Sequence, residues 1–457
     1  MKKYKENPLG YRPVRKLLPE LAIPAIIANL VNAVYNVVDQ IFIGQKIGYL
    51  GNAATNIAFP LTTICLAIGL MTGIGAASNF NIELGRKNED EARKVAGTAV
   101  SMLIISGLFI TILIRLFLEP IMIMFGATEQ ILDYSMEYTN ITSLGIPFLL
   151  FGIGTNPLVR ADGDSKYSMI AIVTGALMNI VLDYTFMFVL DMGIDGAAWA
   201  TVISQIIVSL ILARYFKNFK SVRFQLEDFI PKLKEYWIII SLGFTSFVFQ
   251  FSNMIVQVLT NNLLKYHGEL SIYGSDIPIA IAGIVIKINI IFTSIIIGLV
   301  QGAQPISGFN YGAQKYSRVR ETIKLLLKSS AVVSLVAFTL IQVFPKQIIG
   351  IFGQGNEPYF ELGVRYLRIF LVFILLNGMQ ISISTFFPSI GKAKKGAIIS
   401  LSKQVIILIP LLLILPNLIG IDGIIFATPI SDLLTFIIAV WLLYNELKEM
   451  PKEDVID

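Results

Sequence analysis

The chain has 457 residues, of which 55% are hydrophobic and 15% are charged. Its mean hydropathy is +0.72, whereas soluble domains are roughly half apolar and about a quarter charged. The net charge is +5, but the basic residues are scattered between apolar blocks, so we expect no nucleic-acid partner. One cysteine (Cys65) and one histidine (His267) argue against an intramolecular disulfide, a thiolate metal cluster and a zinc or haem site.

Long apolar blocks recur along the chain, and a block of 18 or more such residues can cross the hydrocarbon layer as a helix. The N-terminal block follows a basic segment but is too long for a signal peptide, so we interpret it as a retained first helix. We predict an all-α, polytopic membrane protein with twelve spans. The predicted spans are residues 17–43, 52–81, 92–118, 131–158, 167–190, 195–216, 234–265, 277–304, 318–343, 358–388, 396–415 and 422–446.

Lysine and arginine orient these spans, because they are enriched in the cytoplasmic loops of membrane proteins. Most of the 36 basic residues lie in the two tails and in the loops that follow even-numbered spans. Examples are "GRKNEDEARK", "RYFKNFKSVRF" and "GKAKKG". We therefore expect a multi-pass protein of the cell membrane with both termini in the cytoplasm.

An internal repeat divides the chain. "GIDGAAWATVIS" begins at Gly193 and "GIDGIIFATPIS" begins 227 residues later, at Gly420. The same offset places Gly75 over Gly302. We predict two parallel six-helix lobes, residues 1–217 and 234–457, joined by a cytoplasmic linker at 218–233 and related by a pseudo-two-fold axis along the membrane normal.

The repeated turn itself has a structural interpretation. Gly193 and Gly420 suit the residue that follows a helix. Asp195 and Asp422 suit the N-cap of the next helix.

Two carboxylates lie inside predicted spans, where ionisable residues are costly and are candidates for function. Asp39 and Asp183 both fall in the outer halves of their spans. Asn179 precedes Asp183 by four residues and shares its helix face, and Thr201 and Tyr138 fall at a similar depth. We expect these five residues to share one pocket in the N-terminal half.

Such a pocket suits the binding of a coupling ion. Two nearby carboxylates in a low dielectric take up a proton or a cation, and sodium also accepts carboxylate, amide and hydroxyl ligands. The alternative is that Asp39 or Asp183 only caps the outer end of its helix. We expect H⁺ or Na⁺ as coupling ion, with Na⁺ ligands at Asp39, Asn179, Asp183 and Thr201, and no other cofactor.

Lys287 is a third intramembrane charge, about ten residues into its predicted span and near the bilayer midplane. Lys287 either forms an ion pair with an acidic residue or lines the transport cavity. In the second half, Asp183 aligns with about Leu411 and Asn179 with about Ile407. We therefore expect the acidic chemistry in the first half alone.

Several motifs resemble those of the multidrug and toxic compound extrusion (MATE) transporters, in particular their bacterial multidrug-efflux branch. They are "YNVVDQIFIGQKIG", "NPLVRADGDSKYSM", "LMNIVLDYTFMFVLDMGIDGAAWAT" and "QGAQPISGFNYGAQKYSRV". The resemblance covers nearly the whole chain and implies a V-shaped, two-lobed antiporter that exports bulky, often cationic compounds in exchange for H⁺ or Na⁺.

The resemblance also assigns roles to residues. The family's cation site carries over onto Asp39, Asn179, Asp183 and Thr201, with Tyr138 adjacent. We expect the substrate-binding residues to be Tyr35, Asn36, Asn156 and Lys287.

Three alternatives remain open. A lipid-linked oligosaccharide flippase of the same superfamily would show more cationic residues in its cavity. A major-facilitator transporter shares twelve spans and parallel halves, but "QGAQPISGFNYGA" argues against it. The third alternative is a membrane enzyme or receptor, but no segment resembles a nucleophile–base pair or a metal motif, so we expect a transporter and not an enzyme. Its expected partners are small organic molecules, especially lipophilic cations, and membrane lipids, and we expect a monomer.

Overall fold

The computed structural model describes residues 7–127, 129–274, 276–352 and 357–454. Every regular element in these ranges is a helix, which confirms the all-α class. Eleven of the described helices are long and apolar enough to cross a membrane, and the number is twelve if α12 (Glu357–Phe370) and α13 (Ile374–Ser389), bent by 45°, form one span. The predicted tenth span is this bent pair.

The first half of the chain contains the helices that precede the segment at 217–232. Among them η1 is a 3-10 turn and η2 is a π-helical continuation of α6. The elements are η1 (Pro8–Gly10), α1 (Val14–Lys46), α2 (Tyr49–Gly85), α3 (Glu89–Leu116), α4 (Leu118–Met124), α5 (Glu129–Ala161), α6 (Ser165–Tyr184), η2 (Thr185–Val189) and α7 (Gly193–Phe216).

The second half repeats this order. A short 3-10 turn, η3, lies in the connecting segment, and a π-helical stretch, η4, interrupts the predicted eleventh span. The elements besides α12 and α13 are η3 (Leu226–Phe229), α8 (Leu233–Glu269), α9 (Asp276–Gly312), α10 (Tyr316–Val343), α11 (Pro345–Phe352), α14 (Ala393–Leu401), η4 (Ser402–Leu408), α15 (Ile409–Ile419) and α16 (Ile421–Glu449).

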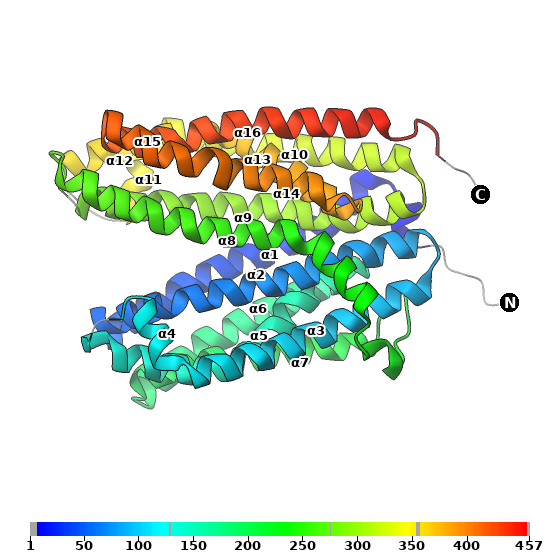
Figure 1. The fold of residues 1–457 in the computed structure, drawn as a ribbon, viewed down its shortest axis with the longest axis horizontal. Helices are drawn as coiled ribbons and strands as arrows, with labels where there is room; N and C mark the ends of the chain where they lie inside the picture. Colours follow the sequence, from blue (N-terminus) through cyan, green and yellow to red (C-terminus); the bar gives the residue numbers. More distant parts are fainter. Residues whose placement is uncertain (1–6, 128, 275, 353–356, 455–457) are drawn as a thin grey trace.

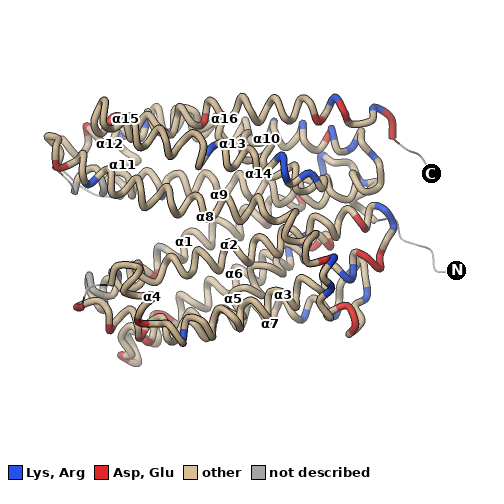
Figure 2. The backbone as a smooth tube through the Cα atoms, viewed as in Figure 1, with Lys and Arg blue, Asp and Glu red and all other residues tan. Residues whose placement is uncertain are grey.

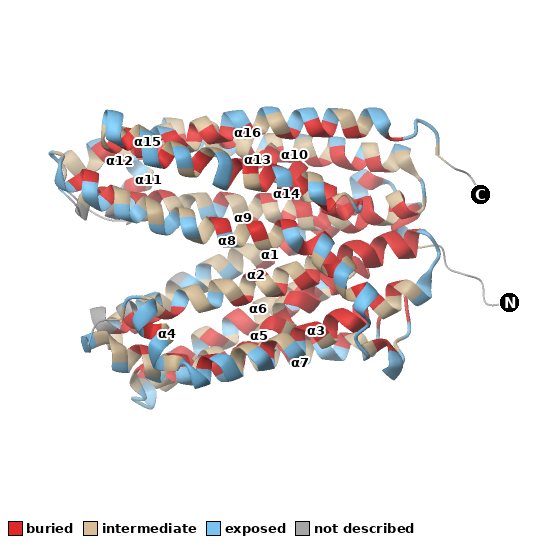
Figure 3. Ribbon diagram, in the orientation of Figure 1, coloured by how far each residue is buried: buried red, intermediate tan, exposed pale blue. Residues whose placement is uncertain are grey.

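The helices form two groups that meet at one end and spread at the other. Figure 1 shows α2–α7 in one group, here the N-lobe, and α8–α16 in the other, the C-lobe, with both chain ends on the side where the groups meet. Lysine and arginine gather at this same end (Figure 2). Figure 3 shows buried residues concentrated there as well. We call it the terminal end, and the opposite end the open end.

Glycines bring the two lobes together at the terminal end. A Cβ on Gly75 of α2 would lie 2.0 Å from the carbonyl oxygen of Ile239 on α8, and one on Gly302 of α9 would lie 2.6 Å from the Cα of Ala22 on α1. Real Cβ atoms essentially never approach so closely, so only glycine permits these distances. Gly75 and Gly302 are 227 residues apart, so the repeat makes corresponding contacts from both halves.

A second pair of glycines lies at the contact between α2 and α9, and we call the contacts of the two pairs together the glycine seam. A Cβ on Gly85 would lie 2.0 Å from the Phe309 carbonyl oxygen, and one on Gly312 would lie 2.0 Å from the Ile82 carbonyl oxygen. Small residues allow such close backbone approach, which favours helix association in lipid. These four glycines therefore define the surface along which the lobes join.

Helix α1 belongs to both lobes. Its first residues, including Leu17 and Leu18, are buried in a core built mainly from α9, α10, α13 and α16, whereas its later part packs against α6 of the N-lobe. The preceding turn is also tied to the C-lobe, because Arg318 donates to the carbonyl oxygens of Leu9 and Arg12 at 3.0 and 2.6 Å. Helix α1 therefore links the two lobes mechanically.

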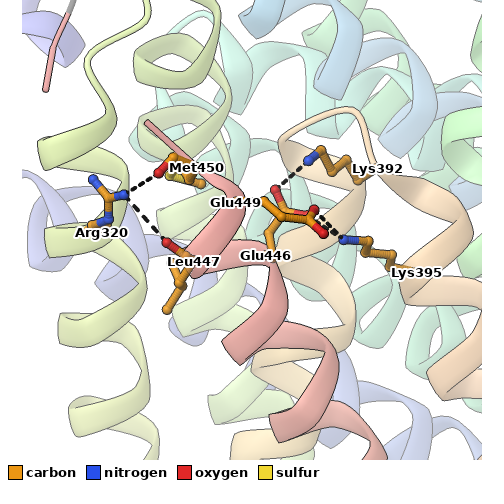
Figure 4. A network of polar contacts seen from close by, with 7 residues as sticks. All are labelled: Arg320, Lys392, Lys395, Glu446, Leu447, Glu449 and Met450. Carbon is orange, nitrogen blue, oxygen red and sulfur yellow. Dashed lines mark hydrogen bonds and ion pairs between the residues drawn. The ribbon is translucent and has the colours of Figure 1, made fainter. Parts of the chain in front are cut away.

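The terminal end of the C-lobe holds a buried carboxylate. Glu446 on α16 accepts hydrogen bonds from Lys392 at 2.6 Å and from Lys395 at 2.7 Å (Figure 4). Beside it, Arg320 of α10 donates to the carbonyl oxygen of Met450 at 2.7 Å, where α16 ends. These contacts tie the end of α16 to α10 and to the turn before α14.

The repeated turn has a different geometry from the one predicted. Gly193 and Gly420 adopt positive φ angles of 61° and 63°, as expected. However, α7 already begins at Gly193 and α16 at Ile421, with Gly420 as its N-cap. Asp195 and Asp422 are therefore not N-caps but lie in the first turn of their helices. A carboxylate in the first turn still interacts favourably with the helix dipole.

Candidate functional site

Asp39 of α1 and Asp183 of α6 face each other in the outer part of the N-lobe. Each carboxyl group interacts with the other, and Asp183 is completely buried. The two residues meet because α1 packs along α6. The structure thus brings together the two intramembrane acids that the sequence singled out.

Three of the four carboxylate oxygens of this pair lack hydrogen-bond donors. Among the described protein atoms, no donor reaches Oδ1 of Asp39 or either carboxylate oxygen of Asp183. Oδ1 of Asn179, a residue that is 2% exposed, is likewise without a donor. A buried acceptor without a partner carries a desolvation penalty of about 1–3 kcal/mol, and more when it is charged. The four oxygens therefore form an acceptor-rich site that a proton or a cation would complete.

Hydroxyl groups border this acceptor cluster. The Tyr138 hydroxyl lies close to Thr201 and within electrostatic range of both carboxylates. Tyr35, one turn before Asp39, interacts with both carboxylates as well. All five residues of the expected cation site therefore lie in one neighbourhood of the N-lobe.

The site offers carboxylate, amide and hydroxyl oxygens. Among the described residues there is no group of three or more His, Cys, Asp or Glu that could hold a metal ion, and this pocket contains two carboxylates. Carboxylate, amide and hydroxyl oxygens are ligands for hard cations such as Na⁺, and two facing carboxylates also suit a shared proton. The residues fit either ion.

An aromatic cluster covers the open-end side of this site. Phe42 of α1 contacts Tyr184 and Phe188, with ring centroids 6.3 and 5.7 Å apart. The π-helical segment η2 begins directly after Tyr184. Because π segments shift the residues that follow by a fraction of a turn and often occur at functional sites, η2 places Phe188 over α1.

Lys287 is exposed and lies on α9, a helix that packs against α1. Farther along α9, the Asn29 side chain of α1 donates to the carbonyl oxygen of Ser294 at 3.4 Å and to the side-chain oxygen of Gln301 at 3.2 Å. The depth of Lys287 in the bilayer stays a prediction. Helix α9 has 37 residues and continues to Gly312, so Lys287 is about 17 Å from the open end of a helix about 55 Å long.

The other expected substrate residues separate into two places. Asn36 is exposed, and its side-chain nitrogen donates to the Asn32 carbonyl oxygen at 2.6 Å. Asn156 is buried among Arg160 and Ser168. It follows Tyr138 by 18 residues on the same helix, which corresponds to about 27 Å. The structure therefore does not bring Asn156 to the site at Asp39.

The C-lobe contains a buried ion pair that the sequence analysis missed. Lys403 in η4 and Asp432 of α16 are joined by a 2.7 Å Nζ–Oδ1 contact, with side chains 10% and 3% exposed. Asn377 of α13 donates to both Asp432 oxygens at 3.2 and 3.3 Å. Both charged residues lie inside predicted spans, so the rule that singled out Asp39 could have found them. The second half thus also buries a carboxylate, but Asp432 has a lysine as its counter-charge, and the expectation that ion coupling is confined to the first half stays a prediction.

Comparison with known proteins was made by family, by sequence and by structure. The family model described as MatE matches residues 24–185 and 241–414, one segment in each half. Multidrug export protein MepA of Staphylococcus haemolyticus (strain JCSC1435) is 25% identical over 436 residues, covering 94% of this chain and 93% of that protein. MepA of Staphylococcus aureus (strain NCTC 8325 / PS 47) is 25% identical over 433 residues and 94% of each chain.

Solved structures share the fold. One, described as the outward-facing conformation of a multidrug resistance MATE family transporter of the MOP superfamily, aligns with a TM-score of 0.91 at 23% identity over 99% of this chain and 100% of that one. A MOP superfamily transporter from Pyrococcus furiosus Vc1 (DSM3638) aligns with a TM-score of 0.90, also at 23% identity and with the same coverage. The family match covers most of the chain and both of its halves. The chain therefore belongs to the MatE family and is a multi-pass membrane transporter, not an enzyme.

Proposed function

We propose that this protein is a secondary antiporter that exports bulky, often cationic drugs or toxic organic compounds in exchange for H⁺ or Na⁺. The observation that carries the proposal is the set of buried carboxylate oxygens on Asp39 and Asp183 that lack donors. A coupling ion supplies the missing positive charge. The relatives named as multidrug export proteins support the class of cargo.

The position of the site on α1 couples ion binding to the relative position of the two lobes. Without an ion, two facing carboxylates repel each other in a low dielectric, so the outer part of α1 is held less firmly against α6. With an ion, the repulsion becomes attraction and α1 packs against the N-lobe. Because the first part of α1 is buried in the C-lobe core, ion binding biases the relative position of the lobes, as alternating access requires.

Cargo would bind between the lobes toward the open end. Tyr35 and Asn36 on α1 and Lys287 on α9 occupy this region in our proposal. Tyr35 is half-buried beside the acids, and Asn36 is exposed. The terminal end faces the cytoplasm of the cell, because Lys and Arg gather there. We propose a monomer in the plasma membrane, surrounded by lipid.

The test uses purified protein in proteoliposomes with a fluorescent lipophilic cation. A pH gradient and a sodium gradient are imposed separately. One of them should drive uptake, and Asp39→Asn and Asp183→Asn should each reduce the rate at least tenfold. Asp191→Asn is the matched control, since this exposed carboxylate pairs with Lys46 at the open end. Wild-type rates in both site variants would refute the proposed site.

A lipid-linked oligosaccharide flippase is the second candidate, and Lys287 is the observation that favours it. An exposed ammonium on α9, a helix that packs against α1, suits an anionic pyrophosphate better than a cationic drug. The two functions differ in the effect of Lys287→Ala. For a cation exporter the change should leave transport unchanged or raise it, whereas for a flippase it should abolish translocation of a fluorescent lipid-linked saccharide.

A further inference from the structure

Arg160, in the last turn of α5, is a buried cation without a carboxylate partner among the described residues. It is 5% exposed. Its Nη1 donates to Oδ1 of Asn156 and, at 3.3 Å, to the Ser168 hydroxyl, and both acceptors are neutral. A buried charge that lacks an opposite charge is strongly unfavourable. This arrangement therefore requires compensation from a group outside these contacts.

The nearest acid along the chain is already bound elsewhere. Asp162 accepts hydrogen bonds from the Tyr215 hydroxyl at 2.8 Å and from the backbone nitrogens of Lys220 and Ser221 at 2.7 and 2.9 Å. Its carboxylate thus holds the segment that follows α7. It is not available to neutralise Arg160.

Arg160 lines a small pocket between the lobes. The other polar side chains in its wall are Ser78 and Asn81 of α2 and Gln301 and Gln304 of α9. The remaining lining residues are alanine and proline, so none of the nine carries a carboxylate. The wall combines a guanidinium, three amides and a hydroxyl, all of which can donate hydrogen bonds.

One wall residue has an unmade hydrogen bond. Asn81 is 2% exposed and its Oδ1 has no donor among the described atoms. The two ends of an amide have nearly the same shape, so the same side chain can present its NH₂ to the pocket. The pocket volume is about 10 Å³, which corresponds to about one water-sized particle.

We propose that this pocket binds a small inorganic anion of the halide class, chloride in the cell. The anion neutralises Arg160 and accepts hydrogen bonds from α2 and α9, so it bridges the two lobes at the terminal end. A monovalent halide loses less hydration free energy on burial than doubly charged sulfate or phosphate. Anion binding therefore stabilises the arrangement in which the lobes are joined at this end, independently of the cargo and of the acids at Asp39 and Asp183.

The test measures thermal unfolding of the purified protein in detergent. Sodium chloride replaces sodium gluconate at constant sodium concentration, so that the N-lobe site sees no change. The midpoint should rise with chloride, because at a concentration of about 100 times Kd the folded-to-unfolded ratio increases about 100-fold. Bromide should act like chloride, and sulfate should not. Equal midpoints in chloride and gluconate would overturn the proposal.

Two variants locate the effect. Arg160→Gln should lose the dependence on chloride, whereas Arg86→Gln, which removes an exposed guanidinium paired with Glu83, should keep it. If Arg160→Gln retains the full dependence, the site is elsewhere and the proposal fails. If this variant does not fold, crystals of the wild-type protein in bromide decide. An anomalous peak beside Arg160 supports the site, and a pocket without one refutes it.

Discussion

Gly302→Ala should destabilise the arrangement in which the lobes are joined at the terminal end. Its Cβ would lie 2.6 Å from the N and Cα of Ala22, and relief requires a separation of at least 3.4 Å. Helices α1 and α9 must therefore move apart by about 0.8 Å, the difference of these distances. A change of side-chain rotamer cannot relieve this contact, because the nearest Ala22 atoms belong to the backbone. Overpacking of this kind costs about 1–3 kcal/mol, which shifts a two-state equilibrium about 5- to 150-fold.

The shift can be read from the accessibility of a cysteine in the seam. Cys65, the chain's single cysteine, is replaced by serine, and Ser78, which is 5% exposed on α2, is replaced by cysteine. Labelling by a membrane-impermeant maleimide from the terminal side should be at least fivefold faster with Gly302→Ala. Gly283→Ala, on the same helix as Gly302, is the control, since a Cβ at Gly283 would meet no neighbouring atom within 4 Å. Equal labelling rates in the two alanine variants would refute the role of the glycine seam.

Two further outcomes are expected from buried charges in the C-lobe. Lys403→Met should lower the free energy of unfolding by about 3–5 kcal/mol, because Asp432 stays buried without a counter-charge. Adding Asp432→Asn should restore most of this loss. Urea unfolding in detergent measures both changes. Burial alone would lower the pKa of Lys392, but its hydrogen bond to Glu446 raises that pKa above the usual value. This contact therefore stabilises the fold fully below the ordinary lysine pKa of about 10.4 and loses its effect as pH rises through the raised value. The difference in melting temperature between wild type and Glu446→Gln should be constant from about pH 7 to 9 and shrink above that pKa.

Each of these outcomes has a clear contrary result. Additive effects of the two substitutions at the C-lobe pair would show that the charges do not stabilise each other. The exposed pair of Arg12 and Glu20, with side chains 38% and 53% exposed, is the control and should couple by less than about 1 kcal/mol. A melting difference that grows at alkaline pH would contradict the assigned contact of Lys392.

The scaffold was predictable because a membrane imposes few solutions. Apolar length fixes the spans, basic residues gather on one side, and the 227-residue repeat pairs Gly75 with Gly302. The acids at Asp39 and Asp183 were predictable for a related reason, since a carboxylate is costly in an apolar span. That α1 packs on α6, which makes these two acids neighbours, is a tertiary fact that the residues alone do not contain.

The misses have physical causes as well. Lys403 follows the basic "GKAKKG" segment closely, so its charge resembles part of a cytoplasmic loop, yet η4 turns it into the lobe beside Asp432. Depth along a helix also depends on where that helix ends. Helix α9 extends eight residues past its predicted end at 304. Asn156 shares a family motif but forms hydrogen bonds far from the acids.

The position of α1 has a consequence for how the chain can be divided. A fragment that ends after α7 would keep Leu17, Leu18 and Leu21 while losing the α9, α10 and α13 side chains that cover them. The complementary fragment would carry a groove with no helix in it. During synthesis, helix α1 must therefore wait for partners made some 300 residues later, such as Ala303 and Val319. The N-terminal half is therefore one copy of the sequence repeat, but it does not form an independent folding unit.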